Sequence, residues 1–327
     1  MTKDLSSVTV AARRRLSRVG LAFFVFFLTV FALQFIVSVL VSPFAPQWAE
    51  APIFLWLLSI LPMYGVAFPL YYLVLRSLPT GEAGGRMMRR RDLCILFFIA
   101  FAVMYVTNLI SVAINALTEL ILGTSSSAGA TELMTSSPLY LTLIFAVILG
   151  PIVEEVMFRG ILLPRLLPFG ERFAILTSAL LFGLFHGNFA QFFYAFAIGL
   201  IFGLVVCRTG RVRHTVILHI LLNFFGSIPA TVLGRAAKRL DLENMDDAAI
   251  LESPEAILTT LATAGYGMLL LAAVAIGLYL LVRYAKRMRP RPTECPIPRG
   301  EVRYLPLSVG GVLYFLMLIA LFVFSYL

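Results

Sequence analysis

Residues 151–159 read P-I-V-E-E-V-M-F-R, residues 182–186 read F-G-L-F-H, and residues 219–223 read H-I-L-L-N. All three stretches lie in apolar surroundings, and together they hold two glutamates and two of the three histidines of the chain. An isolated charge near the centre of a bilayer costs roughly 2.5 to 3.5 kcal/mol on insertion scales, so such residues are normally paired and functional. The three stretches therefore predict a polar site that the rest of the chain holds inside a membrane.

The composition excludes a soluble globular protein. Of the 327 residues, 60% are hydrophobic and 13% are charged, and the mean hydropathy is +0.94. The net charge of +9 does not indicate nucleic-acid binding, because the basic residues lie in short segments between apolar runs rather than on a solvated face. We therefore expect an all-α, polytopic integral membrane helical bundle with no nucleic-acid partner.

About nine apolar stretches come close to the roughly 20 residues that a membrane-spanning helix needs. The predicted spans are Val19–Val41, Pro52–Leu75, Leu93–Leu117, Leu139–Leu163, Phe173–Gly187, Phe189–Cys207, Thr215–Val232, Ile257–Val282 and Leu305–Tyr326. The seventh contains Gly226 and Pro229, so we expect that helix to kink or to end inside the membrane. Three parts follow: residues 1–138 with spans one to three, residues 139–232 with a core of four spans, and residues 233–327 with an extracytoplasmic segment and the last two spans.

The basic residues predict the orientation. With a cytoplasmic N-terminus, all but three of the 26 lysines and arginines fall on the cytoplasmic side. They lie before Val19 and in the segments Arg76–Arg91, Arg159–Arg172, Arg208–Arg213 and Arg283–Arg303. Cytoplasmic loops carry an excess of basic residues, so we expect a multi-pass cell-membrane protein with its N-terminus inside and its C-terminus outside.

Helical spacing predicts how the polar residues face. Glu155 and Arg159 are four residues apart and therefore share a face, which allows them to pair. Glu154 lies about 100° around the helix and can face a cavity instead. His219 and Asn223 also share a face. From the rise of about 1.5 Å per residue, counted from the cytoplasmic ends of the predicted spans, we expect one cavity that opens nearer the cytoplasmic face.

These residue types suit the hydrolysis of an amide. Glu154 and His186 can deprotonate a water, and the imidazole can then pass a proton to a leaving amine. His219 and the amide of Asn223 can donate hydrogen bonds to a developing oxyanion. We therefore expect Glu154, His186, His219 and Asn223 to be the catalytic residues of an enzyme that requires no cofactor.

Alternatives remain at this point. Glu154, His186 and His219 also make a His₂Glu set for zinc, although the His-x-x-x-His pair that usually anchors such a site is missing. Ionisable groups inside a membrane also occur in proton-coupled transporters. A catalytically silent immunity or binding protein is the third alternative.

The same three stretches resemble the CPBP family of membrane proteins. E-E-V-M-F-R fits its E-E-x-x-x-R motif, F-G-L-F-H fits F-x-x-x-H, and H-I-L-L-N fits H-x-x-x-N, in the order of that family. The family includes type II CAAX prenyl endopeptidases, bacteriocin-processing and immunity proteins, and Abi proteins. The resemblance covers roughly Leu139 to Val232.

The resemblance implies an intramembrane endopeptidase, and the family includes members described as metalloproteases as well as an archaeal relative that looks like a glutamate-dependent enzyme without metal. Its partners would be the lipid bilayer and a peptide or protein substrate, lipidated or not, processed as a CAAX-type tail or as a leader or bacteriocin. Glu154 and His186 would activate the water, and His219 and Asn223 would form the oxyanion hole. Glu155 and Arg159 would support the site.

Overall fold

The computed structural model describes residues 2–41, 43–49, 51–123, 133, 136–291 and 307–325, and within them all regular structure is helical. Seven helical segments of this part are long and apolar enough to cross a membrane. They lie in α1 (Thr2–Val41), the run of α3 (Pro52–Ile60), η1 (Leu61–Ala67) and α4 (Phe68–Leu75), α5 (Arg90–Leu122), the segment Leu139–Phe169, α11 (Phe189–Thr209), α12 (Val212–Arg239), and α14 (Pro254–Tyr284) with η5 (Ala285–Met288). The chain is the expected polytopic helical membrane bundle.

Two predicted spans are present as shorter helices. These are α10 (Glu171–Phe185) with 15 residues and α16 (Val309–Phe324) with 16. Both are below the roughly 20 residues that span a bilayer, so the number of nine spans is not confirmed. The division of the chain at residues 138 and 232 stays a prediction.

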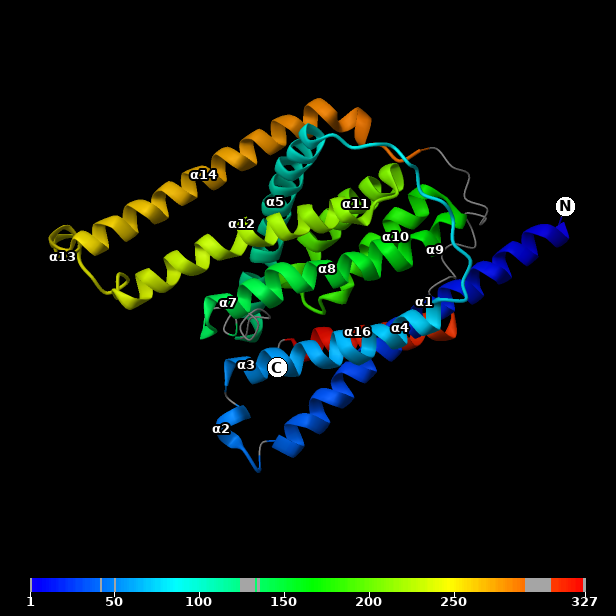
Figure 1. The fold of residues 1–327 in the computed structure, drawn as a ribbon, viewed down its shortest axis with the longest axis horizontal. Helices are drawn as coiled ribbons and strands as arrows, with labels where there is room; N and C mark the ends of the chain where they lie inside the picture. Colours follow the sequence, from blue (N-terminus) through cyan, green and yellow to red (C-terminus); the bar gives the residue numbers. More distant parts are fainter. Residues whose placement is uncertain are drawn as a thin grey trace.

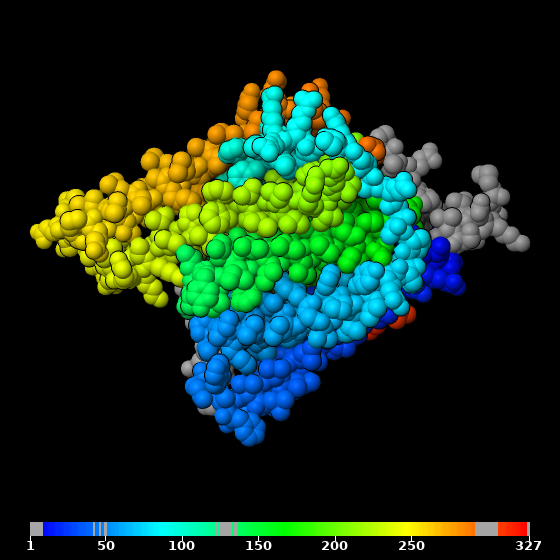
Figure 2. All heavy atoms as spheres, viewed as in Figure 1, coloured from blue at the N-terminus to red at the C-terminus, as the bar shows by residue number. Residues whose placement is uncertain are grey.

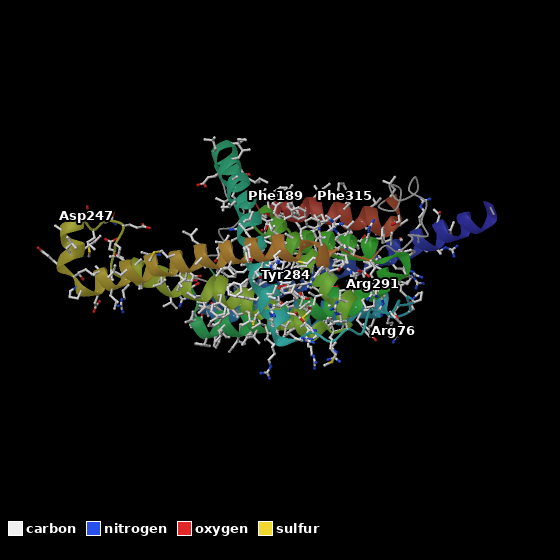
Figure 3. The ribbon with its side chains drawn as sticks, turned by 90° about the horizontal axis from the view of Figure 1, so that it is seen from above. Arg76, Phe189, Asp247, Tyr284, Arg291 and Phe315 are labelled. Atoms are coloured by element: carbon white, nitrogen blue, oxygen red, sulfur yellow. The ribbon has the colours of Figure 1, made fainter. Side chains whose placement is uncertain are left out.

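Opposite ends of the bundle differ in charge. Figure 1 shows the loop after α4 and helix α9 (Leu163–Leu166) on one side, and α2 (Pro46–Ala49), α7 (Leu139–Thr142) and α13 (Asp247–Glu252) on the other. Arg76 and Arg291 lie on the first side and Asp247 lies at the far tip of the second (Figure 3). We call the first side the basic end and the second the opposite end.

Hydrogen bonds join the loops of the basic end. The backbone N–H of Gly81 donates to the carbonyl of Pro164 over 2.7 Å, and that of Gly84 donates to Cys207 over 2.8 Å. The backbone N–H of Arg291 donates to the carboxylate of Glu171 over 3.0 Å. Loops that are far apart in the sequence therefore form one connected surface.

Two arginines that were counted with the cytoplasmic loops are buried instead. Arg159 pairs with Glu155 inside the bundle. Arg165 donates to the carbonyls of Leu75 and Ile161, both over 2.7 Å. The charge asymmetry therefore rests on the other basic residues.

Helix α12 does not end inside the membrane, which was one of the two outcomes expected for the seventh span. It runs without interruption from Val212 to Arg239 with Pro229 inside it. Proline lacks the N–H that would bond to the carbonyl four residues earlier, which is that of Phe225. The hydroxyl of Tyr266 on α14 donates to this carbonyl over 2.7 Å, so the helix continues because a neighbouring helix supplies the missing donor.

An aromatic cluster joins the first helix to the segments that carry the site. The ring of Phe23 on α1 lies 5.6 Å from that of Phe158, which in turn lies 5.0 Å from Phe182 on α10. In Figure 2 the segments 52–75, 139–166 and 212–239 form adjoining bands across one face. The segments that carry the sequence motifs are therefore packed on several sides.

Candidate active site

The two glutamates lie on α8 (Gly150–Glu155), a short α-helical stretch between two π-helical segments, η2 (Leu143–Leu149) and η3 (Val156–Leu162). π-Helical turns inside α-helices occur frequently at functional sites. In η2 the backbone N–H of Gly150 bonds to the carbonyl five residues earlier, that of Phe145. The wider turns rotate the side chains that follow them around the helix axis. The spacing of an ideal α-helix does not predict this rotation.

Glu155 is the centre of a buried polar group. Its Oε1 accepts from Arg159 Nη1 over 3.0 Å, as the spacing predicts, and from His219 Nδ1 over 3.1 Å. The side chains of Glu155 and Arg159 are fully buried, and the Arg159 guanidinium lies 4.2 Å from the ring centre of Phe182. A buried ion pair is stable only when further hydrogen bonds satisfy its charged groups. Here His219 supplies such a hydrogen bond to Glu155.

His219 connects the two glutamates. Because Nδ1 donates to Glu155, that nitrogen carries a proton, and Nε2 faces Oε2 of Glu154 at 3.8 Å. The side chain of His219 is 6% exposed and that of Glu154 is 19% exposed. Glu155 therefore fixes the orientation of the imidazole, while Glu154 stays accessible.

His186 ends α10. Its Nδ1 lies 2.9 Å from the carbonyl oxygen of Phe182, an arrangement in which Nδ1–H donates and Nε2 is left as an acceptor. Glu154 and His219 are among the charged groups that act on this imidazole. After His186, Gly187 takes a left-handed backbone conformation (φ 66°) and Asn188 caps α11 by accepting from the N–H of Gln191 over 2.9 Å. The turn fixes the position of His186, which lines the cavity described below.

Asn223 contacts the segment that carries Glu154. Its Nδ2 donates to the carbonyl of Ala146 over 3.1 Å. The N–H of Gly150 bonds to the carbonyl of Phe145, five residues earlier. In the same register the carbonyl of Ala146 would accept from the N–H of residue 151, but residue 151 is a proline and has no N–H. Asn223 supplies that donor, and an amide NH₂ keeps a second N–H for another acceptor.

One cavity of about 580 Å³ brings the four candidate catalytic residues together. Glu154, His186, His219 and Asn223 all line it, although the first comes from α8, the second from the end of α10, and the last two from α12. Most of its other lining residues are apolar or aromatic, and they include Trp56, Met63, Phe145, Phe182 and Phe185. This is the composition of a small-molecule or peptide site with a few placed polar groups.

We expected the cavity to lie toward the basic end. Most of its lining residues lie nearer the opposite end instead. The helix that carries Glu154 continues from Leu163 to Phe169, so Glu154 is about 22 Å from its basic end rather than about 13 Å. Its lining residues on the Pro52–Leu75 run are Trp56 to Tyr64, from the half nearer the opposite end. The depth expected for Glu154 was too small because it was counted from the end of the apolar run rather than from the end of the helix, and the cytoplasmic opening stays a prediction.

Several polar residues of the cavity were not predicted. These are Ser59, Tyr64, Tyr105, Asn108, Gln191, Tyr194 and Ser227. Tyr64 Oη lies 3.6 Å and Glu154 Oε1 lies 3.9 Å from the point where Gly150 would carry a Cβ, so the glycine leaves room between them. The sequence signals these residues only weakly. The amides Asn108 and Gln191 stand out inside apolar helices, whereas tyrosines are frequent in membrane proteins and do not stand out.

The zinc alternative has less support from the geometry. In the described part of the chain no group of three or more His, Cys, Asp or Glu side chains is arranged to hold a metal ion. The independence from metal stays a prediction.

The family comparison matches the region that holds the site. The family model described as type II CAAX prenyl endopeptidase Rce1-like matches residues 136–225. No curated protein and no solved structure matches the chain. The matched region contains Glu154, Glu155, Arg159, His186, His219 and Asn223. The match covers less than half of the chain, and over residues 136–225 this membrane protein therefore resembles the type II CAAX prenyl endopeptidase Rce1-like family, in agreement with the resemblance of its three motifs.

Proposed function

We propose that the chain is an endopeptidase that hydrolyses a peptide bond of a membrane-associated peptide or protein with a water activated by Glu154 and His186. The observation that supports this most is that four polar side chains from three helical segments line one cavity inside an apolar bundle. Ionisable side chains inside a membrane lower the stability of a protein, so those that are present usually have a function.

The first step is the attack of water on the substrate carbonyl carbon. Glu154 accepts one proton of the water, and the free Nε2 of His186 accepts a hydrogen bond from the other, which orients the oxygen toward the carbonyl. As the C–N bond breaks, the proton taken from the water passes by way of the His186 imidazole to the leaving nitrogen. The products are a carboxylic acid and an amine, and the two glutamates and two histidines return to their starting states.

The oxyanion of the tetrahedral intermediate needs donors. The second N–H of Asn223 supplies one, because the first is held by Ala146. His219 supplies the other from Nε2 in its doubly protonated form, while Glu155 holds Nδ1. One donor of this type typically contributes about 2.7 to 4 kcal/mol to the stabilisation of the transition state.

We also propose the orientation. The loops of the basic end lie in the cytoplasm with the N-terminus, and the C-terminus lies outside, because basic residues are retained on the cytoplasmic side. In this orientation α2, α7 and α13 face the outside of the cell membrane.

The test compares cells that carry the wild-type protein with cells that carry Glu154→Gln. This variant keeps the size of the side chain and removes the base, so a set of cleaved membrane peptides is expected to disappear from the membrane peptidome while the amount of folded protein stays the same. Glu82→Gln, an exposed loop glutamate, is the matched control and is expected to leave the peptidome as in the wild type.

Identical peptidomes in wild type and Glu154→Gln contradict the proposal. An unaltered cellular phenotype with the same result then favours a silent immunity or binding protein. Proton or solute flux through the purified protein, without cleavage, favours a transporter.

A further inference from the structure

A second cavity lies at the basic end of the bundle, and we call it the lateral groove. It has a volume of about 400 Å³ and is lined by residues of α10, of α11 and of the segment that follows α14. Arg172 comes from the first turn of α10, and Arg289 follows η5. Arg291, two residues further along, lies at the basic end (Figure 3). None of the described residues lines both the lateral groove and the cavity that holds Glu154.

Charge and apolar surface are separated along the groove. Arg172, Ile175 and Leu176 share one face of α10, because residues three and four apart lie on the same side of a helix. On α11, Leu200 and Leu204 share a face in the same way. Helix α10 begins at the basic end and α11 ends there, so Leu176 lies about 6 Å deeper than Arg172, and Leu200 about 6 Å deeper than Leu204. The groove is therefore basic near the membrane surface and apolar below it.

The apolar wall of the groove has a packed floor and an exposed rim. Ile175 and Leu204 are buried members of the hydrophobic core. Gly203 brings α11 close to α10, since a Cβ at this position would lie 3.3 Å from Cγ2 of Ile175. Leu176, in contrast, is 55% exposed. In a membrane such a side chain contacts lipid, so the groove is accessible to the acyl chains around the bundle.

Glu171 and Arg208 hold the basic side of the groove in place. The carboxylate of Glu171 accepts from the backbone N–H of Arg291 over 3.0 Å and lies 3.9 Å from Nε of Arg208. The guanidinium of Arg208 also donates to the backbone carbonyl of Arg289. These contacts fix the segment after α14 against α10 and α11, while the side chains of Arg172 and Arg289 stay exposed.

Two arginines above an apolar wall suit an anionic phospholipid. A guanidinium binds two oxygens of a phosphate at once, which an ammonium group does not do. Basic pockets between membrane-spanning helices bind anionic lipid headgroups on the cytoplasmic side, where the basic end is expected to lie. A free phosphate would leave the apolar wall without a partner, and a zwitterionic lipid brings no net charge to the arginines.

We propose that the lateral groove binds one anionic phospholipid of the leaflet at the basic end. Its phosphate lies between the guanidinium groups of Arg172 and Arg289, and one of its acyl chains lies along Leu176, Leu200 and Leu204. The bound lipid contacts α10, α11 and the segment after α14 together. Because these contacts exist only in the folded bundle, the lipid stabilises it.

The first test measures thermal unfolding of the purified full-length protein in a non-ionic detergent during titration with dioleoylphosphatidylglycerol. Arg172→Gln/Arg289→Gln removes the two charges of the groove. Arg76→Gln/Arg86→Gln is the matched control, because it removes two exposed arginines of the same end that do not line the groove. Dioleoylphosphatidylcholine tests the need for a negative headgroup, and glycerol phosphate tests whether the phosphate alone suffices.

Phosphatidylglycerol is expected to raise the unfolding temperature of the wild type and of Arg76→Gln/Arg86→Gln. In Arg172→Gln/Arg289→Gln its apparent affinity should be at least about tenfold weaker, because hydrogen bonds between charged groups are lost. Phosphatidylcholine and glycerol phosphate should leave the unfolding temperature of the wild type unchanged. Equal losses of affinity in the two double variants overturn the inference, and so does an equal response to either of the other two compounds.

The second test fills the apolar part of the groove and keeps both arginines. Leu176→Trp is expected to weaken the binding of phosphatidylglycerol, because the larger side chain occupies the space of the acyl chain. Leu180→Trp is the matched control: Leu180 is exposed one turn further along α10 and does not line the groove, so the binding should stay as in the wild type. Unchanged binding in Leu176→Trp overturns the inference. Neither test requires turnover, so both are separate from the peptidome test of the proposed function.

Discussion

The side-chain amide of Asn223 and the carbonyl oxygen of Ala146 lie 3.1 Å apart and form a hydrogen bond between α12 and η2. A second pair, Tyr266 and Phe225, has the same origin, because in both cases a proline leaves a carbonyl without its helical donor. Inside a membrane, groups of neighbouring helices often satisfy such a carbonyl, and here a side chain does so in both cases. Asn223 thereby contacts the segment of Glu154 with the same amide that we propose as a donor to the oxyanion.

Asn223→Ala is expected to lower kcat roughly 10²- to 10³-fold, because it removes a donor to the oxyanion. The measurement is turnover of a substrate identified from the peptidome comparison. Asn108→Ala, a second amide of the same cavity, is the matched control and is expected to keep most of the activity. Equal losses in the two variants contradict the role of Asn223.

His186→Ala is expected to lower turnover by at least about 10²-fold, the usual contribution of a general acid–base group, without loss of folded protein. The third histidine offers a control: His214 is buried near the start of α12 and does not line the cavity. His214→Ala should retain turnover. Normal turnover in His186→Ala excludes this imidazole from the chemistry.

Arg159→Met is expected to destabilise the protein by about 3 to 5 kcal/mol, because it leaves the buried carboxylate of Glu155 without its cation. Thermal unfolding in detergent measures the change. The double variant Arg159→Met/Glu155→Leu should recover much of the stability but not the activity, since His219 then lacks its orienting acceptor. A double variant as unstable as the single one contradicts this account.

Tyr266→Phe is expected to cost about 0.5 to 2 kcal/mol of stability, the range of interhelical hydrogen bonds in membranes. Pro229→Ala restores the helical N–H that Phe225 lacks. In that background the effect of Tyr266→Phe should shrink toward zero in thermal unfolding. An unchanged effect shows that the hydroxyl does not act through the Phe225 carbonyl.

Exhaustive chelation is expected to leave turnover unchanged, because the three candidate ligands do not converge on one point in the structure. Purified protein is dialysed against a strong chelator and assayed with and without added zinc. A loss of turnover that zinc restores is the result that favours the metal alternative.

Periodicity predicted the contacts that lie within one helical turn. The pairing of Glu155 with Arg159 follows from their spacing, and so does the shared face of His219 and Asn223. The contact of His219 with both glutamates joins helices that are far apart in the sequence, and a hydrogen bond from Asn223 to Ala146 depends on a π-helical register. Neither can be read from the sequence of one helix.

The sequence-based expectations were wrong where contacts with a neighbouring helix determine how far a helix continues. Pro229 predicts a kink or an end of the helix, but α12 continues past it, and Tyr266 on another helix supplies the donor that the Phe225 carbonyl lacks. Apolar runs also underestimate helix length, because polar residues such as Arg165 continue a helix when the bundle satisfies them. The resulting error in depth placed Glu154 nearer the basic end than the helix does.

The fully buried residues Phe158, Arg159, Leu162, Phe202 and Thr215 also bear on the permeability of the membrane. They lie between the cavity and the basic loops along η3, α11 and α12. A water-filled path across the whole bundle would let protons pass between the two compartments. We expect this packed layer to prevent that leak while the cavity admits the water that hydrolysis needs.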